Sequence, residues 1–291
     1  LVKGAYWDSE IKHAQERGLS DFPLFTRKPA TDVSYLACAR DMFDAPHIRP
    51  ALASHNALTI ATIVQWAGNR RDFEFQRLHG MGEGLFERLV QEEGYHCRTY
   101  APVGGHRDLL AYLVRRLLEN GANSSFVHQL ADQSVSEEEL LADPVEKVMA
   151  VGGTRHPAIA LPADLFQPER TNSQGVDLDD AALLSTIAAE IAKPVNLAAP
   201  SVVDPAEAVA KALKAYPAWT STSLYARAEC LDRLADLMEE NRSTLMALAV
   251  QEAKKTIPDA LSEVREAIDF CRYYSARAIA DLVPVELPGP T

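Results

Sequence analysis

The first 121 residues alternate between short apolar runs and longer segments with helical spacing, and this alternation restricts the folds open to the chain. The predicted strands are Leu1–Tyr6, Arg49–Ser54, Asp72–Leu78 and Cys97–Ala101. The predicted helices are Ser9–Arg17, Asp32–Phe43 with Thr31 as its N-cap, Ala57–Gly68, Gly84–Glu93, and His106–Asn120 with Gly121 as its C′ residue. Strands separated by helices favour an α/β fold of parallel βα units with right-handed crossovers.

The four βα units fit two architectures, and the pattern does not choose between them. One is an open parallel sheet, and the other is half of an eight-stranded (β/α)8 barrel. In both, ligands bind beyond the carboxyl ends of the strands. Those ends read Lys3-Gly4-Ala5-Tyr6-Trp7, Ser54-His55-Asn56, Leu78-His79-Gly80 and Tyr100-Ala101-Pro102. Their aromatic, imidazole and amide groups suit a planar ligand that forms hydrogen bonds.

The last predicted helix of this part carries two adjacent arginines, Arg115 and Arg116, with Glu119 one turn later. Adjacent helical residues point about 100° apart, so both guanidinium groups border the leucine-rich face. A solvated helix face is one interpretation. The other is that the pair binds an anionic partner, because a guanidinium forms strong bidentate bonds with a carboxylate.

The rest of the chain has a different pattern. Residues 131–200 are predicted to be a connector, in which Ser136 and Glu139 form a capping box at the start of a short acidic helix. Residues 201–291 are predicted to be mainly helical, with Asp204 as an N-cap before Pro205. The helices expected there are Ala206–Ala215, Ala226–Lys254 and Pro258–Ile279.

Composition excludes some classes of function. Lys and Arg number 29 against 41 Asp and Glu, and the net charge of −12 argues against nonspecific nucleic-acid binding. The four cysteines show no metal-ligand spacing and favour reduced thiols in a cytoplasmic protein without a metal site. Because Leu1 already stands within a predicted strand and 283-VPVELPGPT ends the chain, we expect the sequence to be an internal piece of a longer protein.

Several ungapped blocks together resemble one family. In the first part they are 1-LVKGAYWDSEIKHAQ, 25-FTRK, 35-YLACAR, 73-FEFQRLHGMGE, 98-RTYAPVG and 111-AYLVRRLLENGANSSFV. They resemble the second half of the proline dehydrogenase (β/α)8 TIM-like barrel of the bacterial bifunctional proline utilization A family. Residues 227–278 and 287-LPGPT resemble the start of its aldehyde-dehydrogenase-type domain, and 156-HPAIALPADLF resembles the stretch that joins the two. The implied segments are 1–130 for the half-barrel, 131–200 for the connector and 201–291 for the truncated, mainly helical part.

The resemblance implies roles for the substrate site. Arg115 and Arg116 match the family's arginine pair that binds the carboxylate of L-proline. Glu119 would hold this pair in place or join a gating ion pair. Tyr100 matches a residue that packs on the substrate ring, and Tyr6 matches another tyrosine of the same pocket.

The resemblance also implies a site for FAD. Lys3, Gly4 and Ala5 match a loop whose backbone touches the isoalloxazine and ribityl region, with Trp7 as an aromatic wall. The remaining implied contacts are Thr26 and Lys28 near the adenosine and phosphate, Ser54, His55 and Asn56 at a strand end near the cofactor, and Phe126 near the isoalloxazine.

The implied reaction belongs to proline catabolism: hydride passes from L-proline to FAD, the product is pyrroline-5-carboxylate, and the electrons go to a quinone. The second enzyme is an NAD-dependent dehydrogenase that makes glutamate, and its NAD site would lie beyond residue 291. For the whole protein the resemblance implies a cytoplasmic homo-oligomer with peripheral contact to the inner membrane. A DNA-binding segment, present in some relatives, would lie upstream of residue 1.

Two departures from the family pattern accompany the resemblance. Lys254 stands where the family usually has glycine, and the segment between Ile191 and Ala206 is shorter than expected. We expect the isolated chain to be inactive, because half of a barrel provides only part of a flavin site. The alternative is a non-enzymatic remnant or interaction module from a broken gene.

Overall fold

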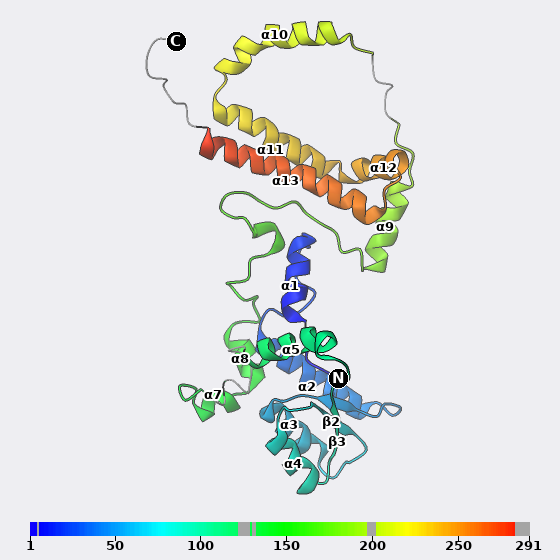
Figure 1. Ribbon diagram of the computed structural model, residues 1–291, viewed down its shortest axis with the longest axis vertical. Helices are drawn as coiled ribbons and strands as arrows, with labels where there is room; N and C mark the ends of the chain where they lie inside the picture. Colours follow the sequence, from blue (N-terminus) through cyan, green and yellow to red (C-terminus); the bar gives the residue numbers. More distant parts are fainter. Residues whose placement is uncertain (5, 122–128, 130–131, 197–201, 283–291) are drawn as a thin grey trace. The chain divides into compact units, whose positions relative to one another are not determined.

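The computed structural model describes residues 1–4, 6–121, 129, 132–196 and 202–282. The chain divides into two compact units (Figure 1). The sheet unit consists of Leu1–Trp7 and Leu24–Ile159, and the helical unit consists of Asp8–Pro23 and Ala160–Thr291. Helix α1 (Trp7–Glu16) therefore belongs, from Asp8 onward, to the helical unit.

The sheet unit contains three parallel strands in chain order, β1 (Ala51–Ala53), β2 (Glu74–Leu78) and β3 (His96–Tyr100). Leu1 extends this order. Its nitrogen donates to the carbonyl oxygen of Ala51 at 2.7 Å, and its carbonyl accepts from the nitrogen of Ala53 at 2.9 Å. This is the bonding pattern of a parallel ladder. The predicted strand Leu1–Tyr6 thus begins beside β1, although the described residues after Leu1 are not in a strand.

Helices cover one face of this sheet. Leu52, Phe75 and Cys97 are register partners on neighbouring strands, and all three belong to or border one apolar core. The core is completed by side chains of α2 (Lys28–Asp44), α3 (Ala57–Ala67) and α4 (Glu83–Gln91). Its members include Tyr35, Ile60, Ile63, Phe73, Phe86, Leu89 and Tyr95. Burying a side chain of this size contributes about 1.5 to 3 kcal/mol each, which makes this face the stabilising one.

The other face of the sheet is polar. Arg98 donates to both carboxylate oxygens of Glu74, at 2.8 and 2.9 Å, and Gln76 donates to the same carboxylate at 2.8 Å. These bonds lower the pKa of Glu74 to about 2. Side chains alternate between the two faces of a strand, so Glu74 and Gln76 point away from Phe75.

Most predicted helix boundaries lie within a few residues of the observed ones, and three need correction. Thr31 is not an N-cap, because α2 begins at Lys28, with Pro29 in its first turn where its fixed φ favours the helix. Gly121 is the last residue of α5 (His106–Gly121) rather than its C′ residue. The predicted helix Ala226–Lys254 is interrupted at Asn241, whose side chain donates to the carbonyl of Leu237 at 2.8 Å.

Short helices follow in the connector. Ser136 caps α7 (Glu137–Leu141), since its hydroxyl accepts from the nitrogen of Glu139 at 3.2 Å, which confirms the predicted helix start. Helix α8 (Pro144–Ala150) packs on α2 within the sheet unit. A 3-10 turn at Pro162–Asp164 (η1) already belongs to the helical unit.

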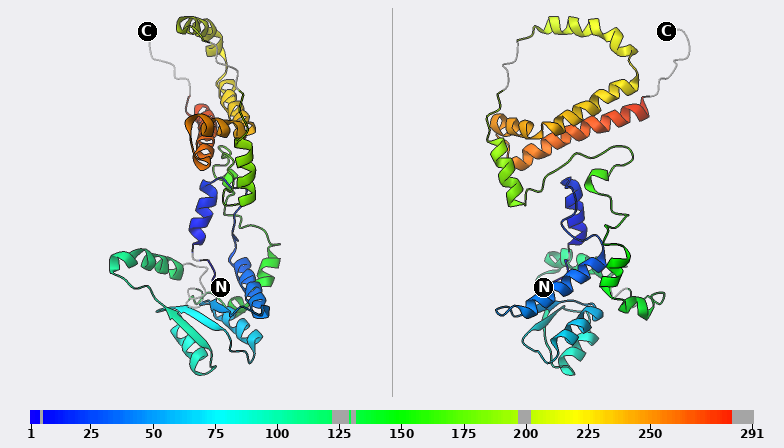
Figure 2. Two further views of the ribbon diagram at one scale, coloured as in Figure 1. Left: turned by 90° about the vertical axis from the view of Figure 1, so that its right-hand side faces the viewer. Right: turned by 180° about the vertical axis from the view of Figure 1, so that it is seen from behind.

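The helical unit is built on two long helices, α11 (Leu224–Glu240) and α13 (Ile257–Asp281), which lie side by side in both views of Figure 2. Helices α9 (Ala181–Ile191) and α12 (Arg242–Ala253) complete its core. Helix α10 (Pro205–Ser221) has Asp204 as its N-cap. The Asp204 carboxylate accepts from the nitrogen of Ala206, which confirms the predicted cap. Within the part of the chain that the structure describes, no helix has the length and apolar character needed to cross a bilayer.

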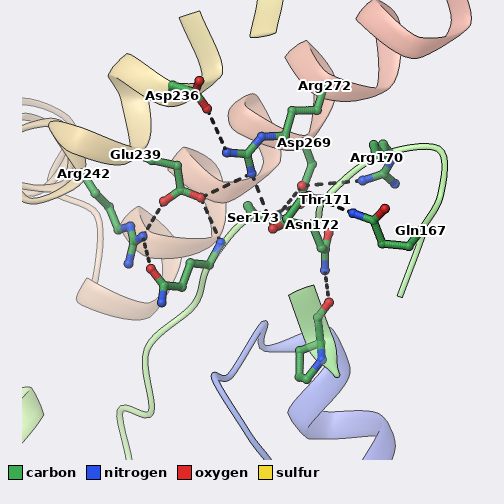
Figure 3. Close-up of polar contacts among 12 residues, drawn as sticks. Gln167, Arg170, Thr171, Asn172, Ser173, Asp236, Glu239, Arg242, Asp269 and Arg272 are labelled. Carbon is green, nitrogen blue, oxygen red and sulfur yellow. Dashed lines mark hydrogen bonds and ion pairs between the residues drawn. The ribbon is translucent and has the colours of Figure 1, made fainter. Parts of the chain in front are cut away.

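Carboxylates attach the middle of the connector, at Ser173 and Gln174, to the long helices (Figure 3). Asp269 of α13 accepts from the backbone nitrogen of Ser173 at 2.7 Å and from its hydroxyl at 2.6 Å. Glu239 of α11 accepts from the nitrogen of Gln174 at 2.9 Å, and Arg272 lies between Glu239 and Asp236, at 3.6 and 3.4 Å. The segment around Ser173 is therefore an integral part of the helical unit.

Candidate functional site

The arginine pair of α5 lies near the strand ends of the sheet unit. The guanidinium carbon of Arg115 is 5.4 Å from the ring centroid of Tyr6, and that of Arg116 is 5.4 Å from the ring of Tyr112. Arg115 is exposed, whereas Arg116 is half-buried. Burial, then the charges of Arg116 and Arg77, lower the pKa of His55, which places the Arg116 charge near the end of β1. Arg116 is therefore partly shielded from solvent, with the Tyr112 ring as one neighbour.

Aromatic rings of the predicted site are accessible. The exposed fractions are 54% for Tyr6, 39% for Trp7 and 40% for Tyr100. The indole nitrogen of Trp7 donates to the carbonyl of Phe25 at 2.9 Å, which fixes the ring's edge. A Cβ added at Gly4 would meet nothing within 4 Å, so the loop before Tyr6 has open space beside its backbone. These groups offer flat apolar surface to a planar ligand.

The Ser54-His55-Asn56 turn joins β1 to α3, and its hydrogen bonds fix the imidazole. Asn56 is the N-cap of α3, since its side-chain oxygen accepts from the nitrogen of Thr59 at 3.0 Å. The buried Ser54 hydroxyl accepts from the nitrogen of Asn56 at 3.2 Å. Ser54 and Asn56 thus shape the turn, which explains their positions without a ligand.

His55 is held as a neutral donor. Its Nε2 accepts from the backbone nitrogen of Leu78 at 3.1 Å, which assigns the proton to Nδ1. The ring also contacts Phe86 edge-on, with 6.1 Å between the centroids. Since its pKa is lowered, His55 is uncharged near neutral pH, and its Nδ1–H can donate to a ligand at the strand end.

Lys3 and Lys28 meet at one carboxylate. The Lys3 ammonium donates to Asp32 Oδ1 at 2.5 Å and to the Thr59 hydroxyl at 2.9 Å, and it lies 5.0 Å from the ring centroid of Tyr35. The Lys28 ammonium donates to the same oxygen of Asp32 at 2.6 Å. Burial, followed by the charge of Lys28, lowers the pKa of Lys3 to about 8. This cluster, Lys3, Lys28, Asp32 and Thr59, is called the lysine cluster below.

The remaining residues predicted for the site either bond to the protein itself or lie outside the described residues. Thr26 accepts from the backbone nitrogen of His156 at 3.0 Å and thereby attaches the connector within the sheet unit. Ala5, Phe126 and the side chain of Glu119 lie outside the described residues. Among the residues that the structure does describe, no three His, Cys, Asp or Glu side chains gather as a metal site requires.

Sequence reasoning missed three residues that the structure brings to this region. Tyr112 stands one turn before Arg116, and this helical spacing could have identified it as a partner. Arg77 donates to the Thr99 hydroxyl at 3.0 Å and to the Met81 carbonyl at 3.2 Å. The i,i+4 spacing of Lys28 and Asp32 on α2 is a local signal for Asp32, whereas its other partner, Lys3, is distant in the chain. The resulting region combines cations, a neutral imidazole and aromatic faces, which suits an anionic substrate beside a planar cofactor.

Two family profiles match the chain. The proline dehydrogenase family matches residues 1–129, and the aldehyde dehydrogenase family matches residues 188–287. The first match ends before the predicted connector, and the second begins at residue 188, within it.

Curated relatives match nearly the whole chain. The Bifunctional protein PutA of Klebsiella aerogenes is 44% identical over 329 residues, covering 97% of this chain and 25% of the relative. That of Rhizobium meliloti is 45% identical over 334 residues, covering 100% of this chain and 27% of the relative. The chain thus spans about a quarter of these proteins. Both alignments are longer than the 291-residue chain, so the relatives contain residues within the aligned region that this chain lacks.

Solved structures match the fold. A crystal structure of bifunctional proline utilization A (PutA) aligns with a TM-score of 0.88 and 49% identity, covering 100% of this chain and 30% of that one. The PutA of Bdellovibrio bacteriovorus inactivated by N-propargylglycine aligns with a TM-score of 0.76 and 31% identity, covering 100% of this chain and 33% of that one.

Proposed function

Because this chain belongs to the family of bifunctional PutA proteins and spans about a quarter of their length, we propose that it contributes to two enzymes of proline catabolism. Residues 1–130 form part of an FAD-dependent L-proline dehydrogenase. Residues 131–200 are a connector, and residues 201–291 begin an NAD-dependent dehydrogenase that makes glutamate from its semialdehyde.

The first part is the second half of a (β/α)8 barrel. Strand order supports this proposal, because Leu1, β1, β2 and β3 are neighbours in the order of the chain and all run parallel. A doubly wound sheet reverses its strand order at a switch point, whereas a barrel keeps neighbours sequential. The polar Glu74–Arg98 face would then line the barrel interior.

The arginine pair binds the carboxylate of L-proline, and this proposal is carried by the position of Arg116. It is half-buried between Tyr112 and the strand end that carries His55, where a carboxylate would gain charge-assisted hydrogen bonds. Arg115 stands over the Tyr6 ring and provides the second guanidinium. Tyr6 and Tyr100 provide apolar contact to the pyrrolidine ring, and Glu119 steadies the pair.

The flavin lies along the strand-end loops. The residues fit it: the backbone at Gly4 has open space for close approach, Trp7 offers an aromatic face, and His55 Nδ1–H is a donor. Lys28 supplies positive charge for the phosphates. The remaining proposed contacts are Lys3, Ala5, Thr26, Ser54, Asn56 and Phe126. When bound, FAD supplies the hydride acceptor, while this chain's residues bind and orient the substrate.

The wider assignments follow from the same family. Electrons would pass to a quinone, which calls for peripheral contact of the whole protein with a membrane. We also propose a cytoplasmic location and a homo-oligomeric assembly for the whole protein. The NAD-binding residues of the second enzyme would come from sequence beyond residue 291.

One experiment tests the dehydrogenase assignment. This chain replaces the matched segment of a whole PutA protein, and the resulting hybrid enzyme is purified and its visible spectrum recorded. We expect bound flavin whose absorbance is bleached by L-proline. A hybrid that folds, as judged by circular dichroism, but binds no flavin would contradict the proposal.

A non-enzymatic remnant is the second candidate, and the alignments favour it in one respect. The relatives contain residues within the aligned region that this chain lacks, which would leave its second enzyme incomplete. Sequencing of the flanking DNA separates the two candidates. A continuous upstream reading frame with the missing strands supports the enzyme, and a stop codon or frameshift supports the remnant.

A further inference from the structure

The family resemblance gives roles to Lys3 and Lys28 of the lysine cluster, but it gives none to Asp32, which binds both. Two ammonium groups on one carboxylate oxygen repel one another, and both donate to Asp32, at 2.5 and 2.6 Å. The side chains of Lys3 and Asp32 are only 14% and 16% exposed, whereas that of Lys28 is 42% exposed. The buried pair therefore interacts through a lower dielectric than the surface, and Asp32 is what allows two cations to stay together.

The cluster also ties the strand-end loop to two helices. Lys3 immediately precedes Gly4, and its ammonium bonds Asp32 of α2 and Thr59 of α3. Two of its three N–H donors are thereby used within the protein, and Tyr35 lies beneath it. The Lys3 side chain is thus directed toward the helices, which leaves the loop backbone to face a ligand.

We propose that Asp32 is a positioning residue of the flavin site, which fixes the loop at Gly4 through Lys3 and holds the Lys28 ammonium where the anionic phosphates of the dinucleotide bind. This inference rests on the proposed function. Lys3, Lys28 and Asp32 together carry one net positive charge, and the half-exposed Lys28 ammonium is the part of the lysine cluster that a ligand can reach. Asp32 itself does not touch the ligand.

The first test measures the titration of Lys3 in the full flavin-free chain. Trace amine labelling at a series of pH values, followed by peptide mass spectrometry, gives the midpoint at which Lys3 becomes reactive. We expect Asp32→Asn to lower this midpoint by about one pH unit, because the Asp32 charge and hydrogen bond raise the pKa of Lys3. Lys28→Met should raise the midpoint, because the Lys28 charge lowers the pKa of Lys3.

The opposite signs make the labelling test decisive. Asp72→Asn is the matched control, since Asp72 pairs with Arg70 through Nε at 2.6 Å in the same unit but away from Lys3. If both test variants move the midpoint in the same direction, or match the control, the inference is wrong. Should Asp32→Asn not fold, the half-exposed Lys28→Met still decides the sign.

The second test measures FAD binding to the flavin-free hybrid enzyme by fluorescence quenching, with the substitutions made in the segment that this chain supplies. We expect Asp32→Asn to raise the Kd for FAD about tenfold, Asp32→Glu to restore part of the affinity, and Asp72→Asn to leave it unchanged. Equal affinities for Asp32→Asn and Asp72→Asn would overturn the role of Asp32 while the flavin assignment stands. No saturable quenching with the otherwise unaltered hybrid enzyme would overturn the flavin assignment, and the inference with it.

Discussion

The two units of this chain both contain clusters of charged side chains, yet the clusters differ in what surrounds them. In the helical unit, Asp269 and Glu239 are bonded to the backbone of Ser173 and Gln174, and Arg272 bridges Glu239 and Asp236. In the sheet unit, His55 follows β1 and Lys28 begins α2, and neither is bonded into such a network of carboxylates and backbone. Charge density alone therefore does not mark a ligand site, and we propose that cations near the carboxyl ends of parallel strands do so here.

The difference reflects what each cluster does for the backbone. The hydrogen bonds from Ser173 to the Asp269 carboxylate replace those that an irregular buried segment cannot make with itself. The strands of the sheet unit need less of this help, because their ladder bonds the backbone and the apolar core around Phe75 buries one face. Side chains such as Asn56 and Thr26 still accept from backbone nitrogens in its loops. Four predictions test this division, from the largest expected effect to the smallest.

The largest effect should come from the close backbone approach in the helical unit. The nitrogen of Gly175 donates to the carbonyl of Gly18 at 2.7 Å, and a Cβ at Gly175 would lie 1.6 Å from the carbonyl oxygen of Arg17. Gly175→Ala must push these segments apart and should lower the free energy of unfolding by about 3 kcal/mol. Urea denaturation followed by circular dichroism measures it.

The matched control for Gly175 lies in the sheet unit. Gly84 is within α4, and a Cβ there meets nothing within 4 Å. Gly84→Ala should leave stability unchanged or raise it by about 0.5 kcal/mol, because alanine favours the helix. Equal losses for the two variants would show that the approach of Gly175 to Arg17 does not constrain the fold.

The second effect is a pH dependence confined to the sheet unit. The pKa of Lys3 is about 8 in the fold, below its ordinary value of 10.5, with burial as the main cause. The unfolded chain then binds more protons than the folded chain between these values, so the free energy of unfolding rises with pH from about 8 to 10.5. The rise should be about 3 kcal/mol, because the two pKa values differ by about 2.5 units.

Tryptophan fluorescence can isolate this rise. Trp219→Phe leaves Trp7 and Trp66 as reporters, and urea unfolding at several pH values compares the chain with a Lys3→Met variant. The rise should be absent from Lys3→Met. A rise of the same size in both would assign the pH dependence to other groups and would contradict the burial of the Lys3 ammonium.

The third effect concerns the substrate. In the hybrid enzyme, Arg116→Met should raise the KM for L-proline about 10- to 100-fold while flavin stays bound, because one or two charge-assisted bonds to the carboxylate are lost. Arg107→Met on the same helix is the control and should leave KM unchanged. An unchanged KM in Arg116→Met would remove the carboxylate site from α5 and leave Arg116 as a surface cation.

Local sequence pattern predicted the helices and three of the four strands expected in the sheet unit, because each is specified by its own apolar spacing and caps. Asn56 and Ser136 confirm this, since both cap helices through bonds to residues three positions later. Leu1–Tyr6 pairs with β1 at Leu1 but is not assigned as a strand in the described residues. The prediction of Thr31 as an N-cap was wrong, because the helix starts one turn earlier, with Pro29 in its first turn. The pairing of Lys3 with Asp32 could not be predicted, because it depends on how the loop crosses α2 rather than on any local pattern.

The same limit explains Arg116. Spacing showed that the arginines adjoin an apolar face, but only the fold brings Arg116 within electrostatic reach of His55. In the helical unit, periodicity continued smoothly across residues 226–254 and hid the break at Asn241, because the apolar positions of α11 and α12 stay in helical register through it. The spacing of apolar residues indicates which side chains face a core, but it does not indicate where one helix ends and the next begins.

The smallest effect returns to the helical unit, at the end of α12. Lys254 has φ 58°, the left-handed conformation, and it is the one described residue other than glycine with a positive φ. Glycine adopts this conformation without a steric penalty, so Lys254→Gly should raise the free energy of unfolding by about 1 kcal/mol. The Lys254 ammonium donates to the carbonyl of Gln251 at 2.6 Å, and its loss offsets part of the gain.

The neighbouring Lys255 supplies the control for this last substitution. It pairs with Glu263 at 2.8 Å and does not have a positive φ, so Lys255→Gly removes an ion pair and adds flexibility without relieving strain. It should therefore lower stability. Thermal unfolding of both variants distinguishes the two cases. If Lys254→Gly also destabilised the chain, the bond to Gln251 would outweigh the backbone strain, and polar contacts would dominate even at this helix end.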